Sequence, residues 1–347
     1  MVISLSYQHL YDFSREWSFP LKDELSLDDF LSVSSEENVD YWQKGALSAI
    51  GLAYSVKPFK SWKEFSCGVT LNFWSDNFNN EWEENFHREG FEEPPPLTES
   101  ADIPMEEFFP PDEEIPLDYQ RTDNYSFNNG FNANIGMLWN KRNFFQKRDQ
   151  LKIGAVFKLP FRGDLEHKRV EKQLINGDIE TTVDKMTEET LDMPMSYGIG
   201  LAYRFPNNIW IAADIYRTEW QDFILNSKED GEISPITGKS LDESNIKATT
   251  QFRFGLEYRT DSKSPYVYSG RMGFFYDPAP TKGGYDEYYG ISTGFGVNKR
   301  TFAFDIAYQL RFGNDIGTSI APYYSLSQNV REHTVYASFI FYLNNFF

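Results

Sequence analysis

The sequence predicts an all-β protein, and more narrowly a transmembrane antiparallel up-and-down β-barrel with about 12 strands. We expect residues 1–347 to form this single domain. Three observations support the prediction. Segments with a two-residue apolar period recur along the chain, short and long links alternate between them, and the last segment is amphipathic and rich in aromatic residues.

The segment "MPMSYGIGLAYRFPNNIWIAADIYRTEWQDF", residues 193–223, shows the first observation best. Ile199, Leu201 and Tyr203 fall on one face, glycines and Ala202 fall on the other, and a short link at 206–208 separates two such runs. Period-two alternation of this kind predicts strands. The same pattern recurs at residues 131–139, 252–259, 289–297 and 302–312.

Alternation alone fits both a soluble β-sandwich and a membrane barrel, because each has one apolar and one polar face. The polar faces here carry glycine, asparagine and charge at the middle of strand after strand, as at Arg253 and Asp305. The apolar faces end in Tyr or Trp, which is typical of the girdles at a membrane interface. These features favour a water-filled lumen and a lipid-facing outer wall.

The links form a second signal, because short ones alternate with long ones. This arrangement is typical of outer-membrane barrels, which have tight periplasmic turns and long extracellular loops. The predicted short links are residues 57–64, 206–208, 261–265 and 300. The predicted long links are residues 13–42, 80–120, 228–245 and 313–327.

The chain ends with "VREHTVYASFIFYLNNFF", which places Val335, Phe339 and Phe341 on one side and stops at Phe347. A final amphipathic strand with a terminal aromatic residue resembles the signal that bacterial outer-membrane assembly machinery recognises. We therefore expect that machinery to be a partner of this chain.

Composition excludes several classes of function. A net charge of -19 argues against nucleic-acid binding, because no basic patch is present to neutralise phosphates. The single cysteine, Cys67, excludes an internal disulfide framework, and we predict that it faces lipid. We expect no cofactor and no metal site. The histidines His9, His87, His167 and His333 lie in no recognisable catalytic signature, so we expect no enzyme, including a barrel-type lipid hydrolase.

Residues 81–118 hold 14 acidic residues, one basic residue (Arg88) and seven prolines. We predict that residues 80–120 form one long, acidic, Pro-rich extracellular loop, because runs of like charge repel and stay solvated. Two interpretations stay open: a loop without a ligand, or a loop that binds divalent cations or bridges lipopolysaccharide.

At this point the sequence resembles the FadL-type family of outer-membrane transporters for long-chain fatty acids and aromatic hydrocarbons. The segments that carry the resemblance are "MPMSYGIGLAYRFPNNIWIAADIYRTEWQDF", "FRFGLEYRTDSKSPYVYSGRMGFFYDPAP" and "YYGISTGFGVNKRTFAFDIAYQL", with weaker matches near residues 49–74 and 151–167. The resemblance implies 14 strands, a signal peptide and an N-terminal hatch with an Asn-Pro-Ala motif. We find none of these features in this sequence, so we expect that Met1 is not the true start of the protein. The alternative is a genuine 12-stranded relative without a hatch.

The resemblance implies uptake of hydrophobic compounds, long-chain fatty acids among them, across the bacterial outer membrane. The ligand is captured by loops, bound in the lumen and released sideways into the bilayer. Membrane lipid, lipopolysaccharide and a hydrophobic small molecule are the implied partners of a monomer. The alternative is a nonspecific or structural porin-like barrel, which would show a large ohmic conductance.

Candidate site residues fall into two groups. A carboxylate head would need a cationic partner in the lumen, and the alternative is that the lumen charges merely pair with one another, with Glu257 as a further partner. The lumen candidates are Lys158, Arg253, Arg271, Asp214 and Asp305. The capture candidates, in predicted extracellular loops, are Trp17, Phe19, Phe86, Phe91, Phe108 and Phe109.

Overall fold

The computed structural model shows a chain built almost wholly of β-strands. It describes residues 1–342 except 13, 29–30, 60, 79, 94–114, 176–177, 184–186, 229–230, 261–263 and 318–326. The α-helix within these residues, α1 (Leu241–Ser244), is a single turn, and two 3₁₀ turns lie at Asp76–Phe78 and Trp220–Asp222. No helix in the described part is long and apolar enough to cross a membrane.

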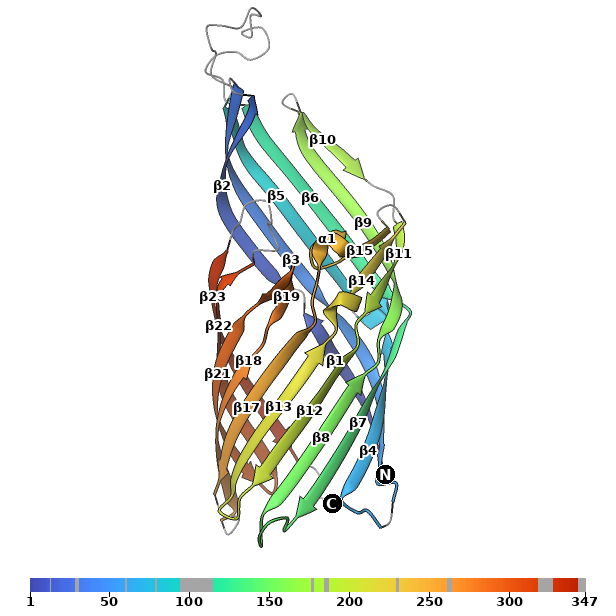
Figure 1. Cartoon of the computed structure of the whole chain (residues 1–347), viewed down its shortest axis with the longest axis vertical. Helices are drawn as coiled ribbons and strands as arrows, with labels where there is room; N and C mark the ends of the chain where they lie inside the picture. Colours follow the sequence, from blue (N-terminus) through green and yellow to red (C-terminus); the bar gives the residue numbers. More distant parts are fainter. Residues whose placement is uncertain are drawn as a thin grey trace, which may run out of the picture.

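Consecutive antiparallel ladders join the strands of what we call the lower sheet (Figure 1). In order of pairing they are β1 (Val2–Asp12), residues 46–56 of β3 (Leu31–Val56), β4 (Phe65–Trp74), β7 (Gly130–Arg142), β8 (Gln150–Lys158), β12 (Ser196–Arg204), β13 (Ile209–Thr218), β17 (Thr249–Arg259), β18 (Tyr266–Tyr276), β21 (Tyr288–Lys299), β22 (Phe302–Ile316) and β23 (Gln328–Phe341). Figure 1 shows this sheet curled about a vertical axis, with β1 beginning and β23 ending at the lower end.

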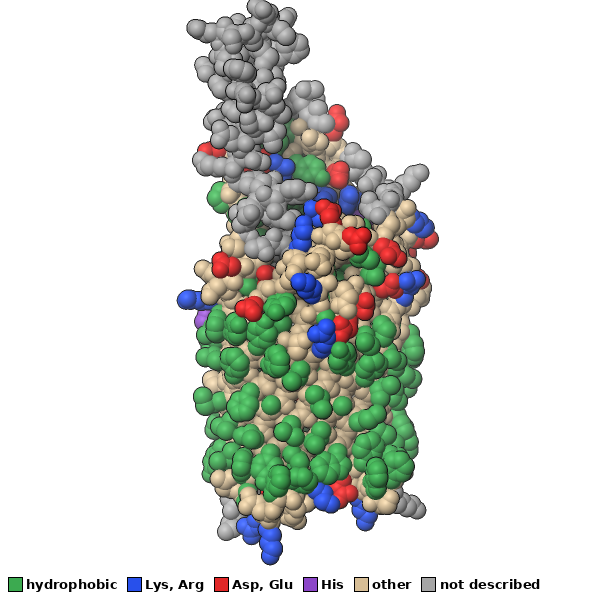
Figure 2. Space-filling view, in the orientation of Figure 1, with side chains coloured by type: hydrophobic (Ala, Val, Ile, Leu, Met, Phe, Trp, Pro, Cys, Tyr) green, Lys and Arg blue, Asp and Glu red, His purple; other side chains and the backbone are tan. Residues whose placement is uncertain are grey.

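The lower sheet turns its large apolar side chains outward. Phe252, Phe254 and Leu256 of β17 are 46%, 51% and 41% exposed, and they alternate with the inward-facing Arg253 and Glu257. Figure 2 shows apolar side chains covering this part of the molecule as a band with few charges. Side chains this apolar are stable in such numbers only where the surroundings are apolar too, as lipid is. The alternation predicted from sequence is therefore confirmed, including its faces.

Short links connect the strands at the lower end. They are residues 57–64, 143–149, 205–208, 260–265 and 300–301, of which residues 60 and 261–263 lie outside the described part. The link at 143–149 was not predicted from the sequence, whereas the other four were. Asn208 in the third turn has a left-handed φ of 64°, a conformation that asparagine tolerates better than most residues.

Above the lower sheet, the chain forms what we call the upper sheet, which Figure 1 shows rising mainly on one side of the molecule. Its strands are β2 (Arg15–Asp28), residues 31–45 of β3, β5 (Glu81–Glu93), β6 (Ile115–Asn128), β9 (Phe161–Ile175), β10 (Asp178–Val183), β11 (Thr187–Met193), β14 (Ile224–Ser227), β15 (Gly231–Ser234) and β16 (Lys239–Ser240). A separate hairpin pairs β19 (Ala279–Thr281) with β20 (Gly284–Asp286).

The upper sheet corrects the prediction that residues 13–42 and 80–120 are loops. Much of both segments is strand, because β5 pairs with β3 on one side and with β6 on the other. Cross-strand pairing offsets the like charges: Arg88 donates two hydrogen bonds to Glu37, at 2.6 and 2.7 Å. Residues 94–114, which hold most of the prolines of this segment, lie outside the described residues.

β3 runs without a break through both sheets, and Gly45 lies where it passes from one to the other. The φ of Gly45 is 134°, and a Cβ at this position would lie 2.4 Å from the carbonyl oxygen of Glu81. Only glycine fits both the backbone conformation and this close approach.

A compact apolar cluster fills the junction of the two sheets. Phe127 and Leu165 are 0% and 1% exposed, and the Trp74 ring stacks on Phe161 at a centroid distance of 5.1 Å. Gly163 lies against the Phe127 ring, where a Cβ would come within 2.2 Å of it. The cluster comprises Leu47, Ala49, Trp74, Phe127, Phe161, Leu165, Leu191, Met193 and Phe223.

Candidate functional site

The inner face of the lower sheet has two chemically different walls. The first, which we call the ionic wall, is formed by β17, β18, β21, β22 and β23 and carries Arg253, Glu257, Arg271, Asp305 and Arg311. The second, which we call the smooth wall, is formed by β4, β7, β8 and β12 and carries Gly68, Gly136, Gly154, Gly198 and Gly200. Alternation places both sets inward, because their strand neighbours are the exposed apolar residues.

Arg271 is the centre of the ionic wall. Its Nε donates to Glu257 at 2.7 Å and its Nη1 donates to Asp305 at 2.5 Å. Glu257 also accepts a hydrogen bond from Arg259. The predicted lumen candidates Arg271 and Asp305 are thus brought together, and the charge of Arg271 is compensated by two carboxylates.

A second group ties β23 to this wall. Arg311 donates to Glu332 at 3.1 Å and lies 3.8 Å from Asp277, and its guanidinium lies 3.5 Å from the centroid of the Tyr288 ring. Gln251 of β17 donates to the same Asp277. Arg311, Asp277 and Glu332 were not among the predicted lumen residues. The period-two pattern does place Arg311 and Glu332 on the inner face.

Asp214 and Arg253 lie directly opposite each other on β13 and β17. Arg253 is exposed and donates to Gln251 at 3.1 Å. Within the described residues, neither side chain has an ion-pair partner within 4.0 Å. Arg253 therefore has the least compensated positive charge on the ionic wall.

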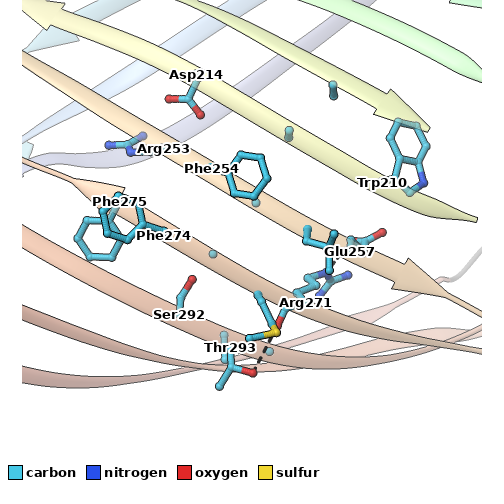
Figure 3. A pocket seen from close by; sticks show the side chains of 18 of the residues that line it. Trp210, Asp214, Arg253, Phe254, Glu257, Arg271, Phe274, Phe275, Ser292 and Thr293 are labelled. Atoms are coloured by element: carbon cyan, nitrogen blue, oxygen red, sulfur yellow. Dashed lines mark hydrogen bonds and ion pairs between the residues drawn. The ribbon is translucent and has the colours of Figure 1, made fainter. Parts of the chain in front are cut away.

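Two cavities lie along the sheet. One of about 740 Å³ is lined by the ionic wall and by Trp210, and one of about 770 Å³ is lined by the smooth wall. Asp214 and Arg253 line both. Figure 3 shows these two side chains on neighbouring strands, with Arg271 beside Glu257 farther along the first cavity. Each volume is within the range of pockets that enclose a small organic ligand.

Lys158, the remaining lumen candidate, lies apart from this group at the upper end of β8. Its ammonium group donates to the Tyr11 hydroxyl and lies 4.2 Å from the centroid of that ring and 6.0 Å from the Trp74 ring. It has no ion-pair partner within 4.0 Å in the described part of the chain. Lys158 thus sits under the apolar cluster, in contact with aromatic rings.

Three capture candidates share one face of the upper sheet. Trp17 pairs with Tyr41 and Tyr41 pairs with Phe86, so they form one row across β2, β3 and β5, and Phe19 lies two residues farther along that face of β2. The Trp17 ring also lies against Gly317 after β22. Phe91 faces the opposite way, because it lies five positions after Phe86 and successive side chains alternate between the two faces. Phe91 therefore does not share a face with Trp17, Phe19 and Phe86. Phe108 and Phe109 lie outside the described residues.

The same face carries a buried ionic cluster centred on Asp123, which is 1% exposed. His167 lies 2.8 Å from its carboxylate, Arg169 donates to it at 2.7 Å, and Arg121 lies 2.9 Å from it. Glu189 lies 3.9 Å from the other ring nitrogen of His167. Burial opposes the charge on His167, but the Asp123 and Glu189 carboxylates outweigh it and raise the pKa of His167 to about 9.

No functional role was predicted for His167 from the sequence. The signal that would have found its position is the alternation of β9, because Phe161, Leu165, His167 and Arg169 share the buried face. The Tyr125 ring stacks on the His167 ring at 4.4 Å and on Trp82 at 4.7 Å. Burial under these rings is a property of the fold, which the sequence pattern does not specify.

No family model and no curated protein matches the chain. Several solved structures do match the chain. A FadL homologue of Pseudomonas aeruginosa matches with a TM-score of 0.50 at 14% identity, covering 97% of this chain and 85% of that one. The chain therefore shares the fold of this FadL homologue.

Two further structures are similar over most of their length. The toluene transporter TbuX of Ralstonia pickettii matches with a TM-score of 0.47 at 9% identity, covering 94% of this chain and 80% of that one. The monoaromatic hydrocarbon channel CymD matches with a TM-score of 0.44 at 12% identity, covering 97% and 84%.

Proposed function

We propose that this chain is an outer-membrane channel for the uptake of hydrophobic compounds. The observation that carries the proposal is the inverted amphipathicity of the lower sheet, with aromatic and aliphatic side chains outside and ion pairs and glycine inside. A lipid-embedded barrel requires this arrangement and a soluble sheet does not. The shared fold supports the same assignment.

The proposal includes closure of the lower sheet. Within the described residues, β1 pairs only with β3 and β23 only with β22, while the Trp17 ring and Gly317 meet above them. Unpaired edges in hydrocarbon would leave backbone groups without hydrogen bonds. Closure therefore comes either from direct pairing of β1 with β23, which gives about 12 strands, or from a further hairpin between them, which gives about 14.

Apolar burial is the source of ligand affinity, at about 0.8 kcal/mol per buried CH₂ group. For a fatty acid, Arg253 and Lys158 are the head-group partners we propose, because neither has a carboxylate within 4.0 Å in the described part of the chain. Arg271 and Asp305 hold the wall together instead. A neutral aromatic compound needs neither cation.

Capture would begin on the aromatic row of Trp17, Tyr41 and Phe86, whose chemistry suits an apolar ligand. The further partners we propose are membrane lipid, lipopolysaccharide around the outer leaflet, and the assembly machinery, which would recognise the C-terminal sequence that ends in Phe347. We propose a monomer with no nucleic-acid partner, in keeping with the acidic net charge.

Two glycines provide a matched test of the lumen as the ligand path. Gly136 on the smooth wall and Gly270 on the outer face each have open space where a Cβ would stand. We expect Gly136→Trp to lower the initial rate of toluene and oleate uptake by cells producing the full chain by about tenfold. Gly270→Trp should leave both rates unchanged, and equal losses in both variants would disprove a luminal path.

Two additional measurements separate the ligand classes and the rival function. Arg253→Gln should lower oleate uptake more than toluene uptake, since only oleate has a carboxylate. In a planar bilayer, the wild-type chain should show little steady conductance. A large ohmic pore would support the nonspecific porin-like alternative instead.

A further inference from the structure

Basic side chains gather at the lower end of a molecule whose net charge is -19. We call this end the lower rim and define it as the described residues of the five lower links, which exclude residues 60 and 261–263, with two strand residues on each side. Figure 2 shows Lys and Arg side chains projecting at this edge, below the apolar band. The described basic residues of the lower rim are Lys57, Lys63, Lys141, Arg142, Lys147, Arg148, Arg204, Arg259, Lys299 and Arg300.

The acidic residues described in the same rim, Glu64 and Asp149, are already engaged. Glu64 accepts from Lys141 at 2.8 Å. Asp149 is 0% exposed and accepts from three backbone N–H groups of its own turn and from the Tyr203 hydroxyl at 2.7 Å. Neither compensates the exposed cations around them.

Three of those cations stand out. Lys57, Arg142 and Lys147 are all exposed, and in the described part of the chain none has a carboxylate within 4.0 Å. Their charges are therefore exposed and have no carboxylate partner among the described residues of the lower rim.

Aromatic rings are interleaved with these cations. Trp62 is 63% exposed and Phe145 is 77% exposed, although both are large apolar residues in short turns. Phe145 packs edge-on against Phe144 at 4.5 Å and against Tyr203 at 5.9 Å. Asp149 fixes the turn that presents these rings, accepting from the N–H groups of Phe144 at 2.6 Å and Phe145 at 2.9 Å.

We propose that the lower rim binds the head groups of anionic phospholipids. Aromatic rings take the interfacial layer of a bilayer, and Lys and Arg beside them attract lipid phosphates that carry a net negative charge. This inference rests on the proposed function: in an outer-membrane channel the short turns lie on the periplasmic side, so the lower end meets the periplasmic leaflet. A zwitterionic leaflet would give exposed, uncompensated cations no comparable partner.

Native mass spectrometry of the full chain, released from micelles with equal phosphatidylglycerol and phosphatidylcholine, tests the proposal. We expect the wild-type chain to retain phosphatidylglycerol over phosphatidylcholine by about fivefold or more. The triple variant Lys57→Gln, Arg142→Gln, Lys147→Gln should lose this preference. High salt should abolish the preference of the wild-type chain as well, since exposed charges are screened.

The matched control removes the same charge from the upper part of the molecule, through Lys168→Gln, Lys172→Gln and Lys282→Gln, all at exposed positions. This control should keep the wild-type preference. The inference would be overturned if the control variant lost as much of its preference for phosphatidylglycerol as the rim variant. It would also be overturned if the wild-type chain showed no such preference. A chain that does not insert into bilayers at all, seen as the absence of a heat-modifiable band in electrophoresis, would instead defeat the proposed function.

Discussion

The lower and upper sheets share a strand and a period-two pattern, yet they use the pattern in opposite senses. In the lower sheet the large apolar residues face outward and the ion pairs face inward, as Phe254 and Arg271 show. In the upper sheet Phe127 and Leu165 are buried, and Lys168 and Lys172 face water. Alternation therefore specifies a strand. Whether its apolar or its polar face is stable on the outside depends on the surrounding medium, lipid or water.

The largest effect should come from truncating a buried ring. Phe127→Ala removes a fully buried side chain from the apolar cluster and should lower the free energy of unfolding by about 3–5 kcal/mol. Phe254→Ala, on the outer face of the lower sheet, should cost less, because detergent fills the vacated space and no cavity remains. Urea unfolding of both variants in detergent micelles, followed by tryptophan fluorescence, measures the difference. Equal decreases in the free energy of unfolding would mean that the two sheets do not differ in which face buries apolar area.

A charge on the outer face should distinguish lipid from water. Phe254→Arg places a cation at the middle of β17 and should destabilise the inserted state by about 2–4 kcal/mol. Asn124→Arg, on the exposed face of β6, should change insertion little. The measurement is the fraction of chain that folds into preformed vesicles. Insertion that tolerates Phe254→Arg as well as Asn124→Arg would contradict a lipid-facing lower sheet.

A smaller effect, confined to the upper sheet, should follow from pH. The pKa of His167 is raised from an ordinary value near 6.5 to about 9, so its contribution is fully present below pH 6.5 and is lost as pH rises through 9. The order of magnitude is roughly 2–3 kcal/mol. Hydrogen exchange of β9 and β11 should therefore speed up between pH 7 and 10, after correction for the intrinsic rate.

The control for this pH effect is His87→Gln, because His87 also lies 3.0 Å from a carboxylate, that of Asp118, but on the outer face. His167→Gln should remove the pH dependence of exchange in β9 and β11, whereas His87→Gln should preserve it. Persistence of the dependence in the His167 variant would assign it to another group.

Much of the lower sheet was predictable from the sequence. Strands such as β12, β13 and β17 alternate so regularly that Ile199 and Phe254 could be assigned to the outer face and Arg253 to the inner one. The reason is physical: lipid on one side and water on the other tolerate few exceptions, so the pattern stays strict. The pairing of Arg271 with Glu257 and Asp305 was foreseen as the alternative to a ligand site.

The upper sheet was not predictable in the same way. Residues 81–93 form a charged run that resembles a solvated loop, and only the partners on both sides turn it into β5. Arg88 shows the cause, because its charge is satisfied by Glu37, which lies 51 residues earlier in the sequence. The candidate site was predictable only in part for the same reason. Alternation predicts that Arg253 faces inward, but whether it forms an ion pair depends on the register between neighbouring strands.

The continuity of β3 has a mechanical consequence. The strand is laddered to β1 and β4 below Gly45 and to β2 and β5 above it. Swinging the upper sheet aside would break many backbone hydrogen bonds together, at about 1 kcal/mol each. The upper sheet is thus better described as a fixed extension of the lower sheet than as a hinged lid. Any opening and closing in the proposed transport would then involve side chains and short connections.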